Sequence, residues 1–244
     1  MPRPRRLSAG VSLVELLVSV TISFVLMIAL VQVLLASKRV DSSSTDVSRM
    51  QESGRNALDF MGRAVRQAGA RVDVNEDFVG TTVDAVAGSP VYGVDVPNSA
   101  PDTIRLQFEA QAGDLDCAGD AAAAGAMMNF TFAIQTTVTP PTLTCTDAAG
   151  VSTVIAAYVE DMQILYGIDA ARDGSIDSYK SNPTATEFGQ VAAVRFFLVV
   201  RSPSADGAAN KTQTYTLNDT KVTKTDGFLR QVYSTTFTVR NQAG

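Results

Sequence analysis

Residues 16–37 form an unbroken run of 22 uncharged and mostly apolar residues, and Glu15 stands directly before it. As an α-helix this run rises roughly 33 Å, which is enough to cross the hydrocarbon core of a bilayer. A carboxylate at the edge of such a span is costly without a partner, so we expect Glu15 to have one. The ten residues that end at Gly10 carry three arginines and no acid.

An ordinary secretory signal does not explain this pattern. Such a signal has an apolar core of about 7–15 residues followed by a small-x-small cleavage site. Here the core is longer, and the small residue near its end, Ala36, has Leu34 two positions before it, which is a poor match. We therefore expect the helix to be retained. Its N-terminus is expected on the cytoplasmic side, because the leader is more positive than Lys38 and Arg39 after the span.

The arrangement from Gly10 to Glu15 resembles the class III signal of type IV prepilins and type II secretion pseudopilins. The resemblance implies that a prepilin peptidase cuts after Gly10, that Val11 becomes a methylated N-terminus, and that Glu15 is the fifth mature residue. It also implies that the Glu15 carboxylate pairs with the amine of Val11 on a neighbouring subunit in a filament. The family usually has Phe at the position of Val11. The alternative is a plain signal anchor that contains Gly and Glu by chance.

Further segments indicate which branch of this superfamily the chain resembles. Residues 51–60 and 66–69 resemble the segment that follows the anchor in PilW-type minor pilins, and residues 228–233 and 239–241 resemble that group's C-terminal strand. The nearest competing family is the J-type pseudopilin of type II secretion.

Composition limits the remaining function classes. The chain has 244 residues, of which 45% are hydrophobic, so one ample globular domain can follow the anchor. A net charge of −5 argues against general nucleic-acid binding, which needs a basic face. The absence of histidine excludes His-based catalytic triads, His zinc ligands and histidine proton shuttles. We expect neither an enzyme nor a resident cofactor.

Two cysteines, Cys117 and Cys145, flank a region rich in Ala, Gly, Asp and Thr. If the domain lies in the periplasm, we expect them to form a disulfide, which would stabilise the fold by roughly 3–4 kcal/mol in the chain-entropy model. Two free buried thiols are the alternative.

A second helical pattern follows the span, and strand patterns follow that. Apolar or small residues recur every three or four positions from Val47 to Ala68, and Gly69 is expected to end one helix from Val11 to Ala68. Asp59 and Arg63 are spaced to pair on its surface. Six runs are typical of strands: Thr103–Phe108, Met128–Thr136, Met162–Tyr166, Val191–Arg201, Thr212–Leu217 and Leu229–Arg240.

This order predicts an α+β fold, in which a long N-terminal helix packs on a C-terminal antiparallel β-sheet, as in the pilin fold that the resemblance implies. The predicted organisation is a leader at 1–10, a transmembrane and filament-core helix at 11–37, its amphipathic second half at 38–69, and a β-rich periplasmic domain at 70–244.

One acidic loop is a candidate metal site. Asp169, Asp173, Ser175 and Asp177 place oxygens at positions 1, 5, 7 and 9 of a calcium-loop spacing, with glycine at position 6. Position 12, which is a bidentate Glu in strong loops, is Lys180. A plain Asp-Gly turn between two strands is the alternative reading.

The resemblance implies a minor pilin of type IV pilus assembly. Its expected partners are other major and minor pilins, the prepilin peptidase, the inner-membrane assembly machinery, and lipid before assembly. The expected location is the bacterial inner membrane and then the pilus. The alternatives are a J-type pseudopilin, an anchored periplasmic binding or adhesion domain that never polymerises, and an anchored enzyme.

Overall fold

The computed structural model describes residues 12–73, 78, 89–96, 100–205, 212–218 and 220–241, so Gly10 and Val11 lie outside the described residues. The chain divides into two compact units, Met1–Thr45 and Asp46–Gly244. Helix α1 (Leu13–Gln67) supplies the described part of the first unit and the beginning of the second.

Helix α1 continues through Ser42–Thr45, four weak helix formers in a row. The Ser42 hydroxyl donates to the Arg39 carbonyl oxygen at 3.0 Å, and the Thr45 hydroxyl donates to the Asp41 carbonyl oxygen at 3.0 Å. These bonds satisfy the hydroxyls on the helix itself. The two side chains therefore do not form the hydrogen bonds that would favour a non-helical backbone. The helix ends close to the predicted Ala68, where Gly69 takes a φ of +77° that favours glycine.

The predicted apolar stripe of α1 is the face that packs in the second unit. Its buried members are Met50, Gly54, Ala57, Met61 and Val65, to which the structure adds Gly62 and Ala64. The expected ion pair between Asp59 and Arg63 does not form among the described residues. The Arg63 guanidinium instead lies 5.6 Å from the centre of the Phe60 ring.

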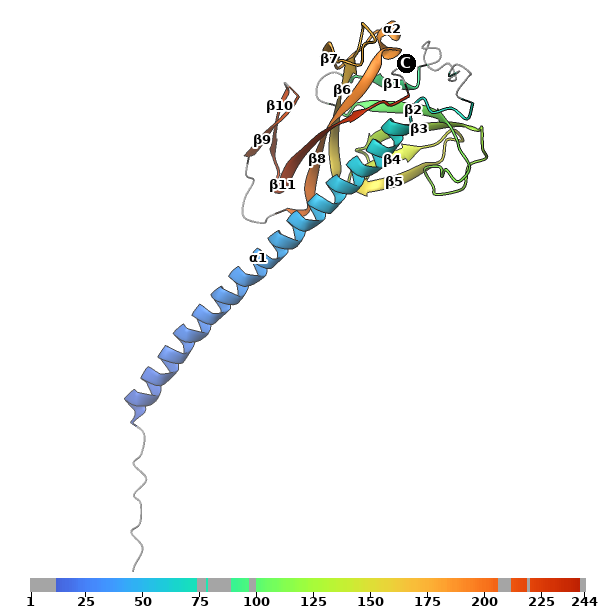
Figure 1. Cartoon of the computed structure of the whole chain (residues 1–244). Helices are drawn as coiled ribbons and strands as arrows, with labels where there is room; N and C mark the ends of the chain where they lie inside the picture. Colours follow the sequence, from blue (N-terminus) through green and yellow to red (C-terminus); the bar gives the residue numbers. More distant parts are fainter. Residues whose placement is uncertain are drawn as a thin grey trace, which may run out of the picture. The chain divides into compact units, whose positions relative to one another are not determined.

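The strands form three antiparallel sheets (Figure 1). The five-stranded sheet has the order β1 (Val91–Val94), β2 (Thr103–Glu109), β3 (Met127–Gln135), β4 (Thr142–Thr146), β5 (Ser152–Ala157). The four-stranded sheet has the order β11 (Phe228–Thr238), β8 (Val191–Ala205), β6 (Val159–Ile168), β7 (Ser178–Lys180). The hairpin β9 (Thr212–Leu217) and β10 (Thr220–Thr225) forms the third, and the short helix α2 (Ala185–Phe188) precedes β8.

The predicted antiparallel strands divide into separate sheets, and one residue explains the division between the two larger ones. Tyr158 is the only residue between β5 and β6, and its φ of 65° lies in the left-handed region. A residue in that conformation turns the chain sharply and ends the pairing on one side. The five-stranded sheet stops there, and the next strand pairs with β8 in the four-stranded sheet.

Helix α1 packs against both of the larger sheets. Phe60 makes ring contacts with Phe130 and Phe132 of β3, with centroid separations of 6.4 and 6.0 Å. Gly54 and Gly62 lie against Tyr233 and Phe237 of β11. Figure 1 shows residues 46–67 crossing the strands, with β8 and β11 on one side and β3 and β4 on the other. The core of the second unit lies beneath this helix.

Candidate assembly site

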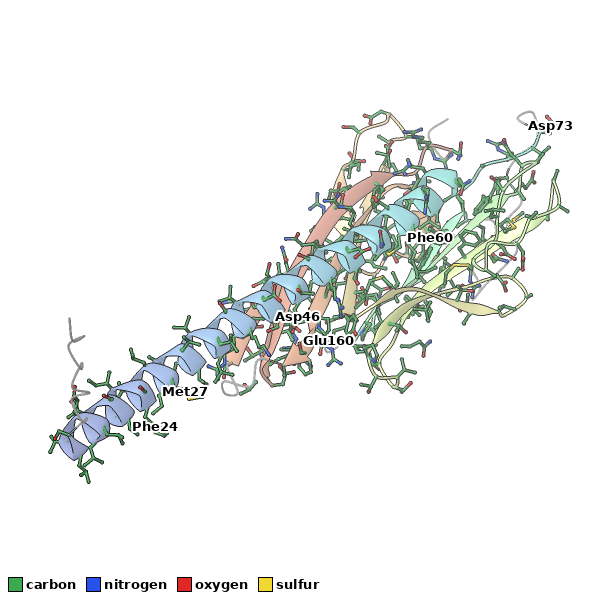
Figure 2. All side chains as sticks on the ribbon, turned by 90° about the horizontal axis from the view of Figure 1, so that it is seen from below. Phe24, Met27, Asp46, Phe60, Asp73 and Glu160 are labelled. Carbon is green, nitrogen blue, oxygen red and sulfur yellow. A yellow bond between two sulfur atoms is a disulfide. The ribbon has the colours of Figure 1, made fainter. Side chains whose placement is uncertain are left out.

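The first unit exposes apolar side chains around the whole circumference of α1. Phe24, Met27 and their neighbours from 24 to 28 are consecutive, and each is at least 47% exposed. At 100° per residue, five consecutive positions cover every side of a helix. Figure 2 shows Phe24 and Met27 projecting from α1. By length and composition, α1 can cross a membrane.

Three hydroxyls within this apolar segment are satisfied inside the helix. The hydroxyls of Ser19, Thr21 and Ser23 donate to the carbonyl oxygens of Glu15, Val18 and Ser19 at 2.7, 2.9 and 2.7 Å. An apolar environment has no water to accept these bonds, so internal acceptors remove the cost of burying the hydroxyls. The segment therefore suits lipid and an apolar protein interior equally well.

Glu15 lies in the first turn of α1, where a carboxylate interacts favourably with the positive end of the helix dipole. Glu15 thus lies directly before the apolar segment, as the sequence indicates. The partner expected from the resemblance, the amine of Val11, lies outside the described residues. The pairing of the two groups stays a prediction.

The junction of α1 with β11 depends on two helical glycines. A Cβ atom added to Gly54 would lie 2.8 Å from Tyr233 Cδ2, and a Cβ at Gly62 would overlap the Phe237 ring. The two glycines are eight residues apart on one face of the helix, and the two rings are four residues apart on one face of the strand. Small residues at these positions let the aromatic rings pack directly on the helix backbone.

The C-terminal end of α1 is capped from a distant part of the chain. The Asn241 side-chain amide donates to the carbonyl oxygens of Arg66, Gln67 and Ala68, at 3.3, 3.4 and 3.2 Å. Helix ends leave such carbonyls without partners inside the helix. The residue that follows β11 by a few positions thus fixes the end of α1 to the four-stranded sheet.

Comparisons with known proteins agree with this architecture. Residues 131–241 match the family model described as type IV pilus-assembly protein W, PilW. The matched region contains Phe132, Tyr233 and Phe237, three of the four rings described above against α1, as well as the capping Asn241.

This match supports a PilW-family pilin.

Among solved structures, the chain resembles a type IV-like pilin from Thermus thermophilus with a TM-score of 0.52 and 15% sequence identity. The likeness covers 80% of this chain and 98% of that pilin, and at this identity it shows a shared fold. No curated protein matches the chain in sequence. The family and the fold support a minor pilin of pilus assembly, and the predicted α+β architecture with a long N-terminal helix is confirmed.

The second unit contains the expected disulfide between Cys117 and Cys145, whose Cα atoms are 5.7 Å apart. Cys145 belongs to β4, and Cys117 belongs to the loop between β2 and β3. The bond therefore attaches the Ala-rich loop, which has few apolar side chains of its own, to the five-stranded sheet. Neither cysteine is free, so the alternative of two free buried thiols is wrong.

The candidate calcium loop folds as a closed turn between β6 and β7. Asp169 accepts backbone N–H bonds from Asp173 and Gly174 at 3.2 and 2.8 Å, Asp173 accepts one from Ser175, and Asp177 accepts one from Ala170. These bonds use the carboxylates to hold the turn. Lys180 pairs with Glu187 at the capping box of α2. The described part of the chain holds no cluster of three potential metal-ligating side chains. The geometry favours the turn, and calcium binding stays a prediction.

A buried arginine ties β11 to its surroundings, and the sequence analysis missed it. Arg230 Nη2 donates to Glu160 Oε1 at 3.1 Å, and Nη1 donates to Asp226 Oδ1 at 2.7 Å, while the arginine side chain is almost fully buried. The hydrogen bonds from Arg230 hold the pKa of Asp226 below its usual range. Burial alone would lower the pKa of Arg230, but its bonds to the two carboxylates outweigh that and raise it. The sequence pattern offers no signal for the pairing with Glu160, since that residue lies 70 positions before Arg230.

A buried acid, Asp102, joins β6 to the segment after β1. Its carboxylate accepts the N–H groups of Val96 and Ile164 at 3.0 and 2.9 Å. Burial raises the pKa of Asp102 to about 6, the two N–H donors lower it in part, and the charges of Asp95 and Asp161 raise it further. Asp102 is structural, because both of its oxygens are occupied by backbone donors.

Proposed function

We propose that this pilin is cut after Gly10, methylated at Val11, and inserted into a pilus through the apolar segment of α1. The observation that carries the proposal is the exposure of large apolar side chains on every side of residues 13–35, which no part of the described chain covers. Such a surface is stable in lipid or among other apolar helices, and unstable in water. The same segment serves first as an inner-membrane anchor and then as the subunit's contribution to the filament core.

Glu15 sets the position of the subunit along the filament in this proposal. A carboxylate carried into an apolar helix bundle costs several kcal/mol unless it is paired, and the methylated amine of Val11 on a neighbouring subunit is the partner. Only one axial position brings the two charges together, so the pair selects that position. The partners of this step are other pilins, the prepilin peptidase and the inner-membrane assembly machinery, and the role is structural and not enzymatic.

Processing is tested by mass spectrometry of the N-terminus of the protein purified from its own membrane. A methylated Val11 supports the proposal. An intact Met1 supports a fixed signal anchor whose globular domain binds or adheres without polymerising.

Assembly is tested by a Glu15→Ala variant, with Ser12→Ala as the control in the same turn. The Glu15 variant should be processed and membrane-bound, but reduced in sheared filaments by about tenfold or more, because loss of the pair removes more than 1.4 kcal/mol. Normal incorporation of Glu15→Ala would contradict the role of this carboxylate.

A further inference from the structure

A cavity of about 640 Å³ lies between the second half of α1 and the loop that carries Cys117. Its lining includes Phe60, Arg63, Arg66, Leu115, Phe130 and Arg240. We call it the arginine pocket. It belongs entirely to the second unit, so a partner held here makes a contact separate from the apolar segment of α1.

The three arginines of the pocket have no carboxylate partner among the described residues. Two of them are held by aromatic rings. The Arg63 guanidinium lies 5.6 Å from the centre of the Phe60 ring, and that of Arg66 lies 5.5 Å from the centre of the Phe237 ring. Stacking fixes the plane of a guanidinium and leaves its N–H edge free to bind a carboxylate with two parallel bonds.

The two acids on either side of Leu115, Asp114 and Asp116, already accept hydrogen bonds. Asp116 Oδ1 accepts the N–H groups of Ala118 and Asp120 at 2.8 and 2.9 Å. Asp114 accepts the N–H of Gln111 at 2.8 Å and the side-chain amide of Gln67. Asp116 is the acid that lines the pocket, so three positive charges face one negative charge there. The pocket is a positive site on a chain whose net charge is −5.

The pocket also has an apolar part. Leu115 is 55% exposed at its wall, and Phe130 is buried at its base, where it stacks on Phe60. Figure 2 labels Phe60 on the second half of α1. Exposed leucine beside unpaired arginines suits a ligand that carries carboxylates on both sides of an apolar side chain, because each group then meets its complement.

We propose that the arginine pocket binds an acidic segment of a neighbouring pilus subunit, with one apolar side chain of that segment against Leu115. This inference rests on the proposed function, since it names a partner surface of the assembled pilin. Charge complementarity identifies the partner's chemistry. The contact would select among subunits after the apolar segments have packed, because those segments offer one oily surface to every sibling.

Binding is tested with the full-length protein in non-ionic detergent and a fluorescein-labelled peptide of sequence Glu-Asp-Leu-Asp-Glu. We expect the Arg63→Gln, Arg66→Gln, Arg240→Gln triple variant to bind about tenfold more weakly or worse, since three charge-assisted contacts are lost. The control is Arg39→Gln, Arg49→Gln, Arg55→Gln, which removes three exposed arginines of the same helix. Equal weakening in both triple variants, or no binding by the wild type, overturns the inference.

Assembly is tested with Leu115→Asp, which places a negative charge at the pocket and leaves the packing of α1 intact. Val151→Asp is the matched control, because Val151 is an apolar residue of similar exposure, 52% against 55%, on another turn. We expect Leu115→Asp to be reduced about tenfold in sheared filaments and Val151→Asp to enter normally. Normal entry of Leu115→Asp overturns the inference and leaves the proposed function standing. Absence of the wild type from filaments overturns the proposed function, and the peptide titration then decides whether the pocket binds acids.

Discussion

Single atoms decide how closely α1 approaches β11. Gly62 has no Cβ, and the Phe237 ring fills the space where that atom would be. The ring has little freedom to move away, because Phe196 and the Arg66 guanidinium hold it from other sides, at 6.2 and 5.5 Å. Glycine is a poor helix former, but at this position it allows the ring to pack closely on the helix.

Replacing Gly62 with Ala should therefore destabilise the domain, although alanine is the better helix former. Overpacking costs about 1–3 kcal/mol, whereas the propensity gain is about 1 kcal/mol. The net change should be a loss of about 1 kcal/mol or more in urea unfolding of the full-length protein. Asn56→Ala, at an exposed position of the same helix, is the control and should be neutral or slightly stabilising. A stabilised Gly62→Ala would show that the ring moves freely.

Asp102 gives the domain a pH dependence of defined sign. Its folded pKa, about 6, lies above the ordinary value of 3.8, so the folded state binds its proton more tightly than the unfolded state. The contribution of this group to stability is full below about pH 4 and is lost as pH rises through about 6. As pH rises across that window, the wild type should lose about 3 kcal/mol of unfolding free energy relative to Asp102→Asn, in urea melts at several pH values. A constant difference would contradict the raised pKa.

At the scale of elements, two devices hold segments that lack sufficient packing of their own. The Asn241 side chain caps the end of α1, and the Cys117–Cys145 disulfide holds the Ala-rich loop against β4. Both join parts that are far apart in sequence. Asn241 is exposed, whereas both cysteines belong to the buried core.

Asn241→Ala should lower the stability of the domain by about 1 kcal/mol, because three carbonyl oxygens of α1 lose a shared donor. Thermal melting measures the loss. Amide hydrogen exchange should localise it to the last turn of α1. Uniform protection in that turn would indicate that water replaces the amide at no cost.

The double variant Cys117→Ser, Cys145→Ser should lose about 3.5 kcal/mol, from the entropy of closing a loop whose ends are 28 residues apart. Denaturant unfolding under oxidising conditions measures this. Reducing agent should destabilise the wild type by a similar amount and leave the double variant unchanged.

Periodicity made the long elements predictable. The stripe of α1 and the six strand runs follow simple repeats of apolar residues, and the structure has an element at each of them. Five strands were missed for physical reasons. Strands β1 and β7 are too short to show an alternation, β4 and β10 each have a single large apolar residue, and β5 turns Val154 toward solvent.

The candidate site was predictable only where it is local. Glu15 and its apolar segment form one continuous motif, and the two cysteines are a simple pair. The contacts of Gly62 with Phe237, of Arg230 with Glu160, and the meeting of Arg63 with Arg240 depend on register between distant segments. A single sequence carries no signal for such pairings, since any exposed arginine has the same local pattern.

The whole molecule combines two units with opposite requirements. The first unit is an apolar helical segment that needs lipid or sibling helices, and the second has a core of its own beneath residues 46–67. Folding of the domain therefore does not depend on the anchor. The pilin can complete its tertiary structure before it leaves the membrane.

A protein that consists of residues 41–244 should accordingly be monomeric without detergent, with a melting temperature within a few degrees of the full-length protein, because all buried residues of the core are kept. Circular dichroism and sedimentation velocity measure these properties. The same protein should be absent from sheared filaments. A molten or aggregated product would show that the anchor contributes to the fold.

The hydroxyls of Ser19, Thr21 and Ser23 bring their own acceptors, so moving this segment between oily surroundings breaks none of their bonds. The energy needed to pull a subunit out of the bilayer is then a matter of how much hydrocarbon surface changes neighbours. An extra turn of leucine would hinder extraction, while swapping one of these hydroxyls for a methyl group would barely alter it. In the proposed assembly, the energy of extraction would therefore depend on the length of the apolar segment and not on these three hydroxyls.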